Sequence, residues 1–474
     1  MKKPGLALSL LPIIILVTMI SVGVRLFGDE ISAGTSQISL LLTTVITAII
    51  SLVVLKIPWS KIEGGMMNHL SKTGSAIFIL LMIGALTGSW MISGVVPAMI
   101  YYGLKLIHPS VFLVVTFILT AVVSLMAGSS WTTVGTIGVA MLSAGQILGI
   151  PAPWLAGAII SGAYFGDKLS PLSDTTNLAA AVAGVDLYTH IKYMLITVTP
   201  AFLISLVIYT VAGFLMPISN STDVAANLGS ISSVFNISPF LLLVPALTII
   251  LILKKVSPFI TLFLSAVAGS IVACLFQPEL CRQIAGDGFS GGVVYFVASL
   301  KMMYGSVSIE TGDTILNSLT ATKGMAGMLN TVWLILCVVT FGGAMEASGM
   351  IQVITERMVR LVKNTFSLVG STVATTLFCN ITLSDQYMAI LLPGKMFSET
   401  YKKMGYEPQL LSRTLEDSGT VTSPLVPWNT CGVAQSGVLG ISTLAYLPYS
   451  FFNLLTPVMT LLVAATGYKI KRKL

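Results

Sequence analysis

Two acidic residues and a proline interrupt an apolar sequence in the segment Gly166-Asp-Lys-Leu-Ser-Pro-Leu-Ser-Asp-Thr-Thr-Asn177. The flanking stretches, residues 152–165 and 178–185, contain no charged side chain. Because the proline opposes a continuous helix, we expect unwound backbone with free carbonyl groups here. Carboxylate, hydroxyl, amide and carbonyl oxygens together suit a hard cation such as Na+. The segment therefore predicts a cation site; the alternative is a polar loop in which Ser173 or Asp174 caps a helix.

A second segment has similar chemistry and reads Glu416-Asp-Ser-Gly-Thr-Val-Thr-Ser-Pro-Leu-Val-Pro-Trp-Asn-Thr430. Two adjacent acids are followed by hydroxyl side chains and prolines, and then by a long apolar run. Adjacent carboxyl groups do not both ionise cheaply in a partly dry site, so we expect Glu416 or Asp417 to carry a proton. The alternative is that Asp417 only stabilises the N-terminus of a helix.

The composition of the whole chain identifies a polytopic membrane protein. Of the 474 residues, 55% are hydrophobic and only 9% are charged, whereas soluble domains carry about 25% charged residues. These figures exclude a soluble globular protein and a disordered chain. The formal net charge of +7 does not indicate nucleic-acid binding, because the cations lie between apolar stretches, where they set membrane topology. The five cysteines and three histidines show no metal-ligand spacing, so a metalloenzyme lacks ligands.

Uncharged runs long enough to span a bilayer recur along the chain. The longest, residues 106–166 and 418–468, must each cross more than once or break inside the membrane. We expect about 11 to 13 transmembrane segments, with re-entrant pieces in addition. Both termini are expected on the cytoplasmic side because lysines and arginines gather there. The predicted division is residues 1–72 for N-terminal helices, 73–217 for a first repeat core, 218–323 for an external linker with connecting helices, and 324–474 for a second repeat core.

Short matches about 255 residues apart indicate an internal repeat. Gly88-Ser-Trp-Met-Ile-Ser-Gly94 resembles Gly343-Ala-Met-Glu-Ala-Ser-Gly349, and Ser170-Pro-Leu172 recurs as Ser423-Pro-Leu425. The positions of the cations give the two halves opposite orientations in the membrane. The predicted fold is therefore all-α, with two inverted-topology repeats and broken or re-entrant helices near the midplane. Such inverted repeats are typical of secondary transporters.

Further polar residues inside apolar runs extend the candidate site. Asp385 ends an uncharged run, and its first-half counterpart, Gly128–Thr136, carries hydroxyl side chains instead. Cation ligation explains these hydroxyls as well as small-residue helix packing does. Lys168 and Arg413 are candidate partners for a carboxylate or for an anionic substrate. The predicted ion- or substrate-binding residues are Asp167, Asp174, Asp385, Asp417, Glu416, Ser173, Thr175, Asn177, Thr420, Asn429, Ser129, Ser130, Thr132 and Thr133, with Na+ at Asp174 and Asp417.

At these residues the sequence resembles the NhaC-type Na+/H+ antiporter family of the ion transporter superfamily. The motifs that carry the resemblance are 128–136, 161–177, Asp385-Gln-Tyr387 with Leu392-Pro-Gly394, and 415–432. The resemblance implies a carrier of the bacterial inner membrane that exchanges Na+ for H+ by alternating access. It implies no cofactor and no enzymatic activity, and its partners are the transported ions and membrane lipids. A homodimer is a further expectation.

The same family includes exchangers of malate for lactate that are coupled to protons and sodium. The alternative function is therefore a Na+- and H+-coupled organic-acid exchanger, in which Lys168, Arg413 or the hydroxyls of residues 129–133 receive a carboxylate. A channel is disfavoured by the repeats and the titratable pairs. An intramembrane enzyme is disfavoured because no nucleophile and base can be paired. ATP-driven pumping is disfavoured because the sequence contains no phosphate-binding motif.

Overall fold

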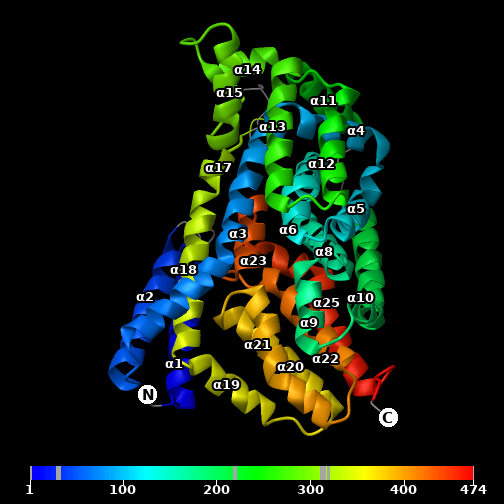
Figure 1. Cartoon of the computed structure of the whole chain (residues 1–474). Helices are drawn as coiled ribbons and strands as arrows, with labels where there is room; N and C mark the ends of the chain where they lie inside the picture. Colours follow the sequence, from blue (N-terminus) through cyan, green and yellow to red (C-terminus); the bar gives the residue numbers. More distant parts are fainter. Residues whose placement is uncertain (1–2, 28–33, 217–220, 310–316, 318–320, 473–474) are drawn as a thin grey trace.

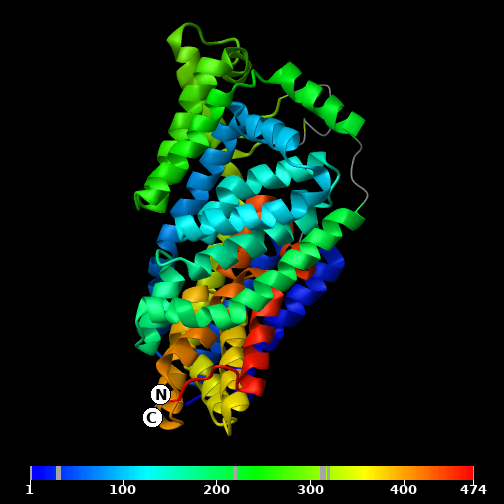
Figure 2. The same ribbon diagram turned by 90° about the vertical axis from the view of Figure 1, so that its right-hand side faces the viewer.

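The computed structural model describes residues 3–27, 34–216, 221–309, 317 and 321–472 of the chain. Within these residues it consists of helices, loops and two isolated β-bridges, without any β-strand (Figure 1). The predicted all-α fold is confirmed. The beginning of α1 and the end of α25 both lie toward the lower end of the molecule in Figures 1 and 2.

The first half runs from the N-terminus to a long helix, α10. Its break points are the ones expected from glycine and proline: the uncharged run 106–166 is divided at Gly128, and the segment 166–177 is divided after Leu169. The helices are α1 (Leu6–Phe27), α2 (Thr35–Ile49) with the π-helical η2 (Ile50–Val54), α3 (Trp59–Ile92), α4 (Val95–Leu106), η3 (Pro109–Val111), α5 (Phe112–Ala127), α6 (Ser130–Thr133), η4 (Val134–Gly138), α7 (Val139–Ile147), α8 (Ala152–Leu169), α9 (Asp174–Ala183) and α10 (Leu187–Leu215).

Connecting helices join the halves, and the second half ends at α25. The connecting helices are α11 (Ser221–Val234), η5 (Pro239–Leu242), α12 (Leu243–Leu253), α13 (Pro258–Phe276), α14 (Pro278–Ala285), α15 (Gly292–Tyr304) and α17 (Gly324–Gly327). The second half comprises α18 (Leu329–Ala347), α19 (Met350–Val359), α20 (Thr365–Thr382), α21 (Gln386–Lys403), α22 (Pro408–Leu415), η6 (Glu416–Thr420), η7 (Ser423–Leu425), α23 (Thr430–Leu439), α24 (Thr443–Tyr446), η8 (Leu447–Tyr449) and α25 (Phe451–Thr466).

Seven helices of the described residues are long and apolar enough to cross a membrane, or up to nine if each of two bent pairs forms one span. The bent pairs are 228–234 with 239–253 and 443–449 with 451–466. This number is lower than the 11 to 13 segments expected from the sequence because many apolar helices, such as α4 and α15, are too short to span alone. The chain is a multi-pass membrane protein, and the count of about 11 to 13 segments stays a prediction.

The two halves repeat one turn in detail. Ser93 and Gly94 join α3 to α4, and Ser348 and Gly349 join α18 to α19. Both glycines have positive φ, 81° and 74°. Each serine donates to a carbonyl three residues earlier and accepts from the amide two residues later. The match found in the sequence therefore corresponds to the same local structure. Whether the halves have opposite orientations in the membrane stays a prediction, and the boundary predicted at residue 73 falls inside α3.

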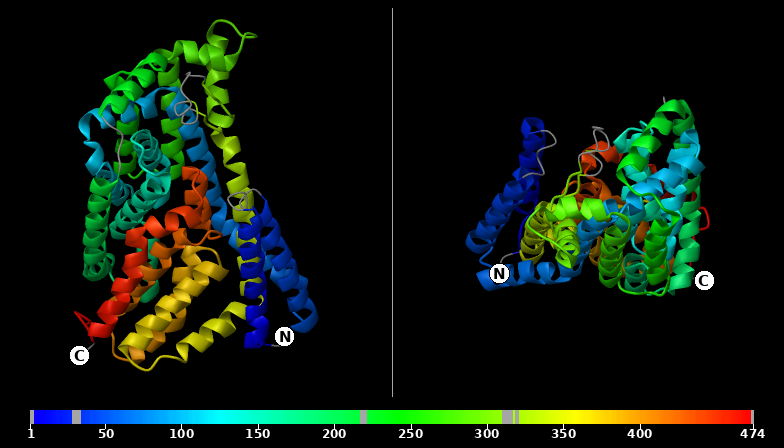
Figure 3. Two further views of the ribbon diagram at one scale, coloured as in Figure 1. Left: turned by 180° about the vertical axis from the view of Figure 1, so that it is seen from behind. Right: turned by 90° about the horizontal axis from the view of Figure 1, so that it is seen from above.

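Helices α3 and α18 cross each other, and Figures 1 and 3 show them side by side. At the crossing, a Cβ on Gly65 would lie 2.6 Å from the Cβ of Ala347, and a Cβ on Gly343 would lie 2.7 Å from the Cα of Met66. Small residues permit this close backbone approach, as they do between membrane helices generally. One turn further along, His69 Nε2 lies 2.5 Å from Glu346 Oε2. The crossing thus joins the two halves by both packing and an ion pair.

Candidate ion-binding pocket and buried charge cluster

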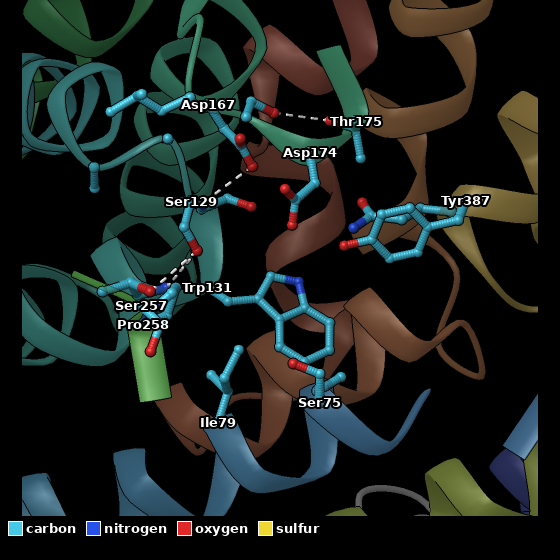
Figure 4. Close-up of a pocket in the computed structure, with 18 of the residues that line it drawn as sticks. Ser75, Ile79, Ser129, Trp131, Asp167, Asp174, Thr175, Ser257, Pro258 and Tyr387 are labelled. Carbon is cyan, nitrogen blue, oxygen red and sulfur yellow. Dashed lines mark hydrogen bonds between the residues drawn. The ribbon is translucent and has the colours of Figure 1, made fainter. Parts of the chain in front are cut away.

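Four helices begin beside one cavity of about 360 Å³, two from each half of the chain. The first-half helices are α6 and α9, and the second-half helices are α21 and α23. Figure 4 shows polar and aromatic side chains around this pocket. The residues from these helix starts that line it are Ser129, Ser130, Trp131, Thr132, Ser173, Asp174, Thr175, Asp385, Gln386, Tyr387 and Thr430, and Asp167 joins them from α8.

In the first half, a glycine and two serine caps fix the pocket. Gly128 ends α5 with φ 65°, and a Cβ at this position would lie 2.6 Å from the Cβ of Leu172. Ser129 then caps α6, accepting from the amide of Thr132, and Ser173 caps α9 in the same way. The expected break after Leu169 is confirmed. The capping serine of the alternative interpretation is present, while Asp174 remains exposed and lines the pocket.

In the second half, an acidic residue occupies the place that Ser129 has in the first. Asp385 caps α21 by accepting from the amide of Met388 at 2.9 Å. The residue before it, Ser384, has φ 58°, a left-handed conformation that non-glycine residues rarely adopt. The amide of Thr430, at the start of α23, donates to the carbonyl of Ser384 at 2.8 Å. The start of α23 therefore supports the strained turn that places Asp385 at the pocket.

Three carboxylates from different elements reach this pocket. Asp167 is 7% exposed and accepts from the amide of Ser130 at 3.0 Å, Asp174 is exposed, and Asp385 is half-buried. In Figure 4, Asp167 and Asp174 point into the space bordered by the rings of Trp131 and Tyr387. Carboxylate and hydroxyl oxygens around one cavity suit a hard cation. Backbone amides at two of these helix starts donate directly to carboxylates, from Ser130 to Asp167 and from Met388 to Asp385.

Behind the pocket, a second group of charges is fully buried. Lys168 pairs with one oxygen of Asp417, Oδ1, and both side chains are 0% exposed. The other oxygen, Oδ2, accepts from Thr197 of α10 at 2.7 Å and from Thr460 of α25 at 2.5 Å. Arg413 Nε lies 4.0 Å from the same oxygen. Protein donors from three helices therefore occupy both oxygens of Asp417.

The pocket and the buried cluster are adjacent along the chain and in space. Asp167 lines the pocket while the next residue, Lys168, belongs to the cluster. Thr175, at the pocket, donates to Glu416 at 3.1 Å, and Glu416 directly precedes Asp417. Glu416 and Asp417 begin η6, a π-helical turn of a kind that is frequent at functional sites. The pocket and the buried cluster are thus connected twice, through the adjacent residues Asp167 and Lys168 and through the hydrogen bond from Thr175 to Glu416.

The predicted residues therefore fall into three groups. Eight lie together at the pocket: Asp167, Asp174, Asp385, Ser129, Ser130, Thr132, Ser173 and Thr175. Four form the buried cluster: Lys168, Arg413, Glu416 and Asp417. The other four support nearby backbone or are buried away from the pocket lining: Thr133, Asn177, Thr420 and Asn429. The structure does not bring Asp417 to the pocket, so it does not join Asp174 and Asp417 around one ion.

Several residues of the pocket and of the buried cluster were not predicted from the sequence. Trp131 and Tyr387 border the pocket, and Thr197 and Thr460 hold Asp417. His190 of α10 is fully buried, and neither ring nitrogen has a hydrogen-bond partner among the described residues. The threonines gave no signal, because a threonine in an apolar helix usually bonds its own backbone. The aromatic residues were visible inside the quoted motifs, next to Ser130 and Gln386.

Comparisons with known proteins found relatives that match most of the chain. Residues 162–468 match the model of the Na+/H+ antiporter family. The chain is 35% identical over 423 residues to the Na+/H+ antiporter NhaC of Alkalihalophilus pseudofirmus, covering 88% of both chains. It is 34% identical to the arginine/ornithine antiporter ArcD of Halobacterium salinarum, over 100% of this chain and 94% of the relative. It is 35% identical to the malate-2H+/Na+-lactate antiporter of Bacillus subtilis, over 86% and 85% of the two chains.

The matched range contains the carboxylates Asp167, Asp174 and Asp385 and the whole buried cluster. The relatives align over most of their own length, so the likeness is not confined to one motif. Their names describe transporters rather than enzymes, as the resemblance implied. The chain therefore belongs to the Na+/H+ antiporter family.

Proposed function

We propose that this protein exchanges Na+ for H+ across the bacterial inner membrane by alternating access. The observation that carries the proposal is the pocket in which Asp167 and Asp174 of the first half meet Asp385 of the second. A site made by both halves changes its exposure when the halves move relative to each other, which is how repeat-built transporters operate. Membership of the Na+/H+ antiporter family supports the choice of ions.

In this proposal Na+ and H+ compete for the pocket carboxylates. Na+ binds carboxylate oxygens together with hydroxyl or carbonyl oxygens, so it requires the ionised form of the acids. Protonation removes that charge, and binding of Na+ releases the proton. The hydroxyls of Ser129, Ser130, Thr132, Ser173 and Thr175 supply further ligands from the helix starts. We assign Glu416, Asp417 and Lys168 to the part that moves with the pocket rather than to the ion itself.

The remaining expectations form part of the same proposal. Both termini lie in the cytoplasm, because lysines occur at both ends of the chain and in the segments that we place inside. Ion gradients supply the driving force, so the exchange requires no cofactor. Lipids surround the helices, and the protein forms a homodimer.

A second candidate function is the exchange of a small organic solute with the same ions. The cavity of about 360 Å³ lies within the range of small-molecule sites, about 300 to 1,000 Å³. The rings of Trp131 and Tyr387 suit an organic solute better than a bare ion. Lys168 and Arg413 are fully buried, so hydroxyls at the positive helix ends or the pocket-lining Lys72 and Lys255 would receive its carboxylate. The names of two relatives support this candidate with two solute pairs, malate with lactate and arginine with ornithine.

The test uses purified protein in proteoliposomes that contain a pH-sensitive dye. We expect Na+ alone to move protons against an imposed pH gradient, because the proposal needs no other solute. The same vesicles then receive malate with lactate, and separately arginine with ornithine. Proton movement only with malate and lactate would make the protein an organic-acid exchanger, and movement only with arginine and ornithine would make it an amino-acid exchanger. Li+ and K+ define the cation preference.

A further inference from the structure

We propose that Thr197 and Thr460 are positioning residues that hold Asp417 in place, so that they set the rate of the transport cycle without contributing to ion affinity. The inference rests on the proposed exchange and concerns residues outside the pocket. It starts from the contacts of Asp417, which has donors on both oxygens. Neither threonine is among the residues that line the pocket.

The two hydroxyls converge on one atom from different helices. Thr197 of α10 and Thr460 of α25 lie 2.7 Å and 2.5 Å from Asp417 Oδ2, and all three side chains are 0% exposed. Hydrogen bonds to an ionised acceptor are stronger than bonds between neutral groups. Helices α10 and α25 are the last helices of the first and second halves. One carboxylate therefore joins the ends of both halves.

The bond made by Thr460 differs from that of a neighbouring threonine on the same helix. Thr456, also 0% exposed, donates to the carbonyl of Phe452 four residues earlier, which is the usual arrangement for a threonine inside a helix. Thr460 instead donates across to η6. Thr197 lies 3.0 Å from the carbonyl of Met194 and closer to Asp417. Since a hydroxyl has one proton to donate, the charged acceptor is favoured.

A short series of bonds leads from these threonines to the pocket. Asp417 pairs with Lys168, the residue that follows Asp167. The carbonyl of Lys168 accepts from Thr176 at 2.9 Å, which joins the end of α8 to the start of α9. The carboxylates of Asp167 and Asp174 project from these two ends into the pocket (Figure 4). Any movement of the pocket-bearing ends relative to α10 and α25 must therefore act on Asp417.

This geometry separates affinity from rate. When either threonine is changed, Ser129, Ser173 and Asp385 still cap the helices that begin at the pocket. The affinity of the pocket for Na+ should therefore stay the same. What changes is the number of donors that keep Asp417, and through it Lys168, in a single arrangement. With fewer donors the charged group adopts other arrangements, and the concerted movement of the helices becomes slower.

The experiment measures Na+-driven proton movement in proteoliposomes for Thr460→Val, Thr197→Val and Thr460→Ser. We expect Thr460→Val to lower the maximal rate roughly tenfold, the factor for losing one hydrogen bond to a charged group in the transition state of the cycle. The Na+ concentration for half-maximal rate should stay within about twofold. Thr460→Ser should restore the rate because it keeps the hydroxyl. Thr456→Val is the matched control, with the same change one turn away on α25, and should keep the parental rate.

Three results would overturn the inference. These are a parental rate in Thr460→Val, an equal loss in Thr456→Val, and a higher half-maximal Na+ concentration at an unchanged rate. If Thr460→Val yields no folded protein, Thr197→Val decides, since it removes the other donor to the same oxygen; a parental rate there would again overturn it. Exchange by the unchanged protein is measured in parallel, so failure of the proposed function is recognised separately.

Discussion

The pocket carboxylates and Asp417 are the same chemical group in opposite settings. Asp174 and Asp385 are at least partly exposed to the pocket, at the starts of helices. Asp417 is 0% exposed and has an ammonium group and two hydroxyls on its oxygens. A carboxylate whose oxygens are occupied by protein donors cannot bind cargo until those donors move away. Burial of an acidic residue inside a membrane protein is therefore not enough to identify it as a ligand of the transported ion.

Lys168→Met should have the largest effect, because it breaks an ion pair whose two side chains are both 0% exposed. Without Lys168, the buried Asp417 keeps only Arg413, whose Nε lies 4.0 Å from Oδ2, and the hydroxyls of Thr197 and Thr460. Loss of one partner of a buried pair costs about 3 to 5 kcal/mol. We expect a large fall in the melting temperature in detergent and loss of exchange. Replacing both partners, in Lys168→Met with Asp417→Leu, should recover only part of the stability and none of the exchange, because the buried Arg413 then lacks the carboxylate beside it. A single variant as stable as the parent would show that Asp417 is neutral or reached by water.

Asp174→Asn and Asp385→Asn should affect transport without affecting the fold. Asparagine caps helices as well as aspartate does, so the start of α21 should persist. We expect each variant to lose at least about tenfold in Na+-driven proton movement, since a neutral amide neither carries the proton nor supplies the charge for Na+. Asp186→Asn is the matched control, because Asp186 caps α10 outside the pocket. A melting temperature that falls with the transport rate would contradict the division between pocket and cluster.

The sequence predicted the pocket better than the cluster, for a physical reason. Prolines and capping residues act locally, so the unwound backbone around Pro171 could be inferred from a short segment, and the similarity of residues 88–94 and 343–349 from their sequences. The pairing of Lys168 with Asp417 joins residues 249 positions apart and depends on how whole helices pack. Adjacent acids at 416 and 417 therefore suggested one shared site, whereas the structure directs them to different partners.

The number of membrane-spanning helices was also difficult to predict from the sequence. Hydropathy predicts that a run enters the membrane, but it does not predict where a long run breaks. The run 418–468 divides into η7, α23, α24 and α25 within a few residues of prolines and glycines. The bend of 59° between 443–449 and 451–466 depends on neighbouring helices as well as on local sequence. Fold class was therefore accessible from composition, and the exact segments were not.

The pair of His69 with Glu346 gives an intermediate case and the smallest expected effect. Their exposures are 3% and 29%, between the fully buried pair and Arg282 with Glu279 at 59% and 75%. Glu346→Gln keeps an acceptor for the imidazole but removes the charge, so we expect a loss of roughly 1 to 2 kcal/mol in stability and a modest fall in exchange. Glu279→Gln should leave the melting temperature unchanged, because exposed pairs contribute little. If Glu346→Gln were as costly as Lys168→Met, the α3–α18 crossing rather than burial would decide how much an ion pair matters in this protein.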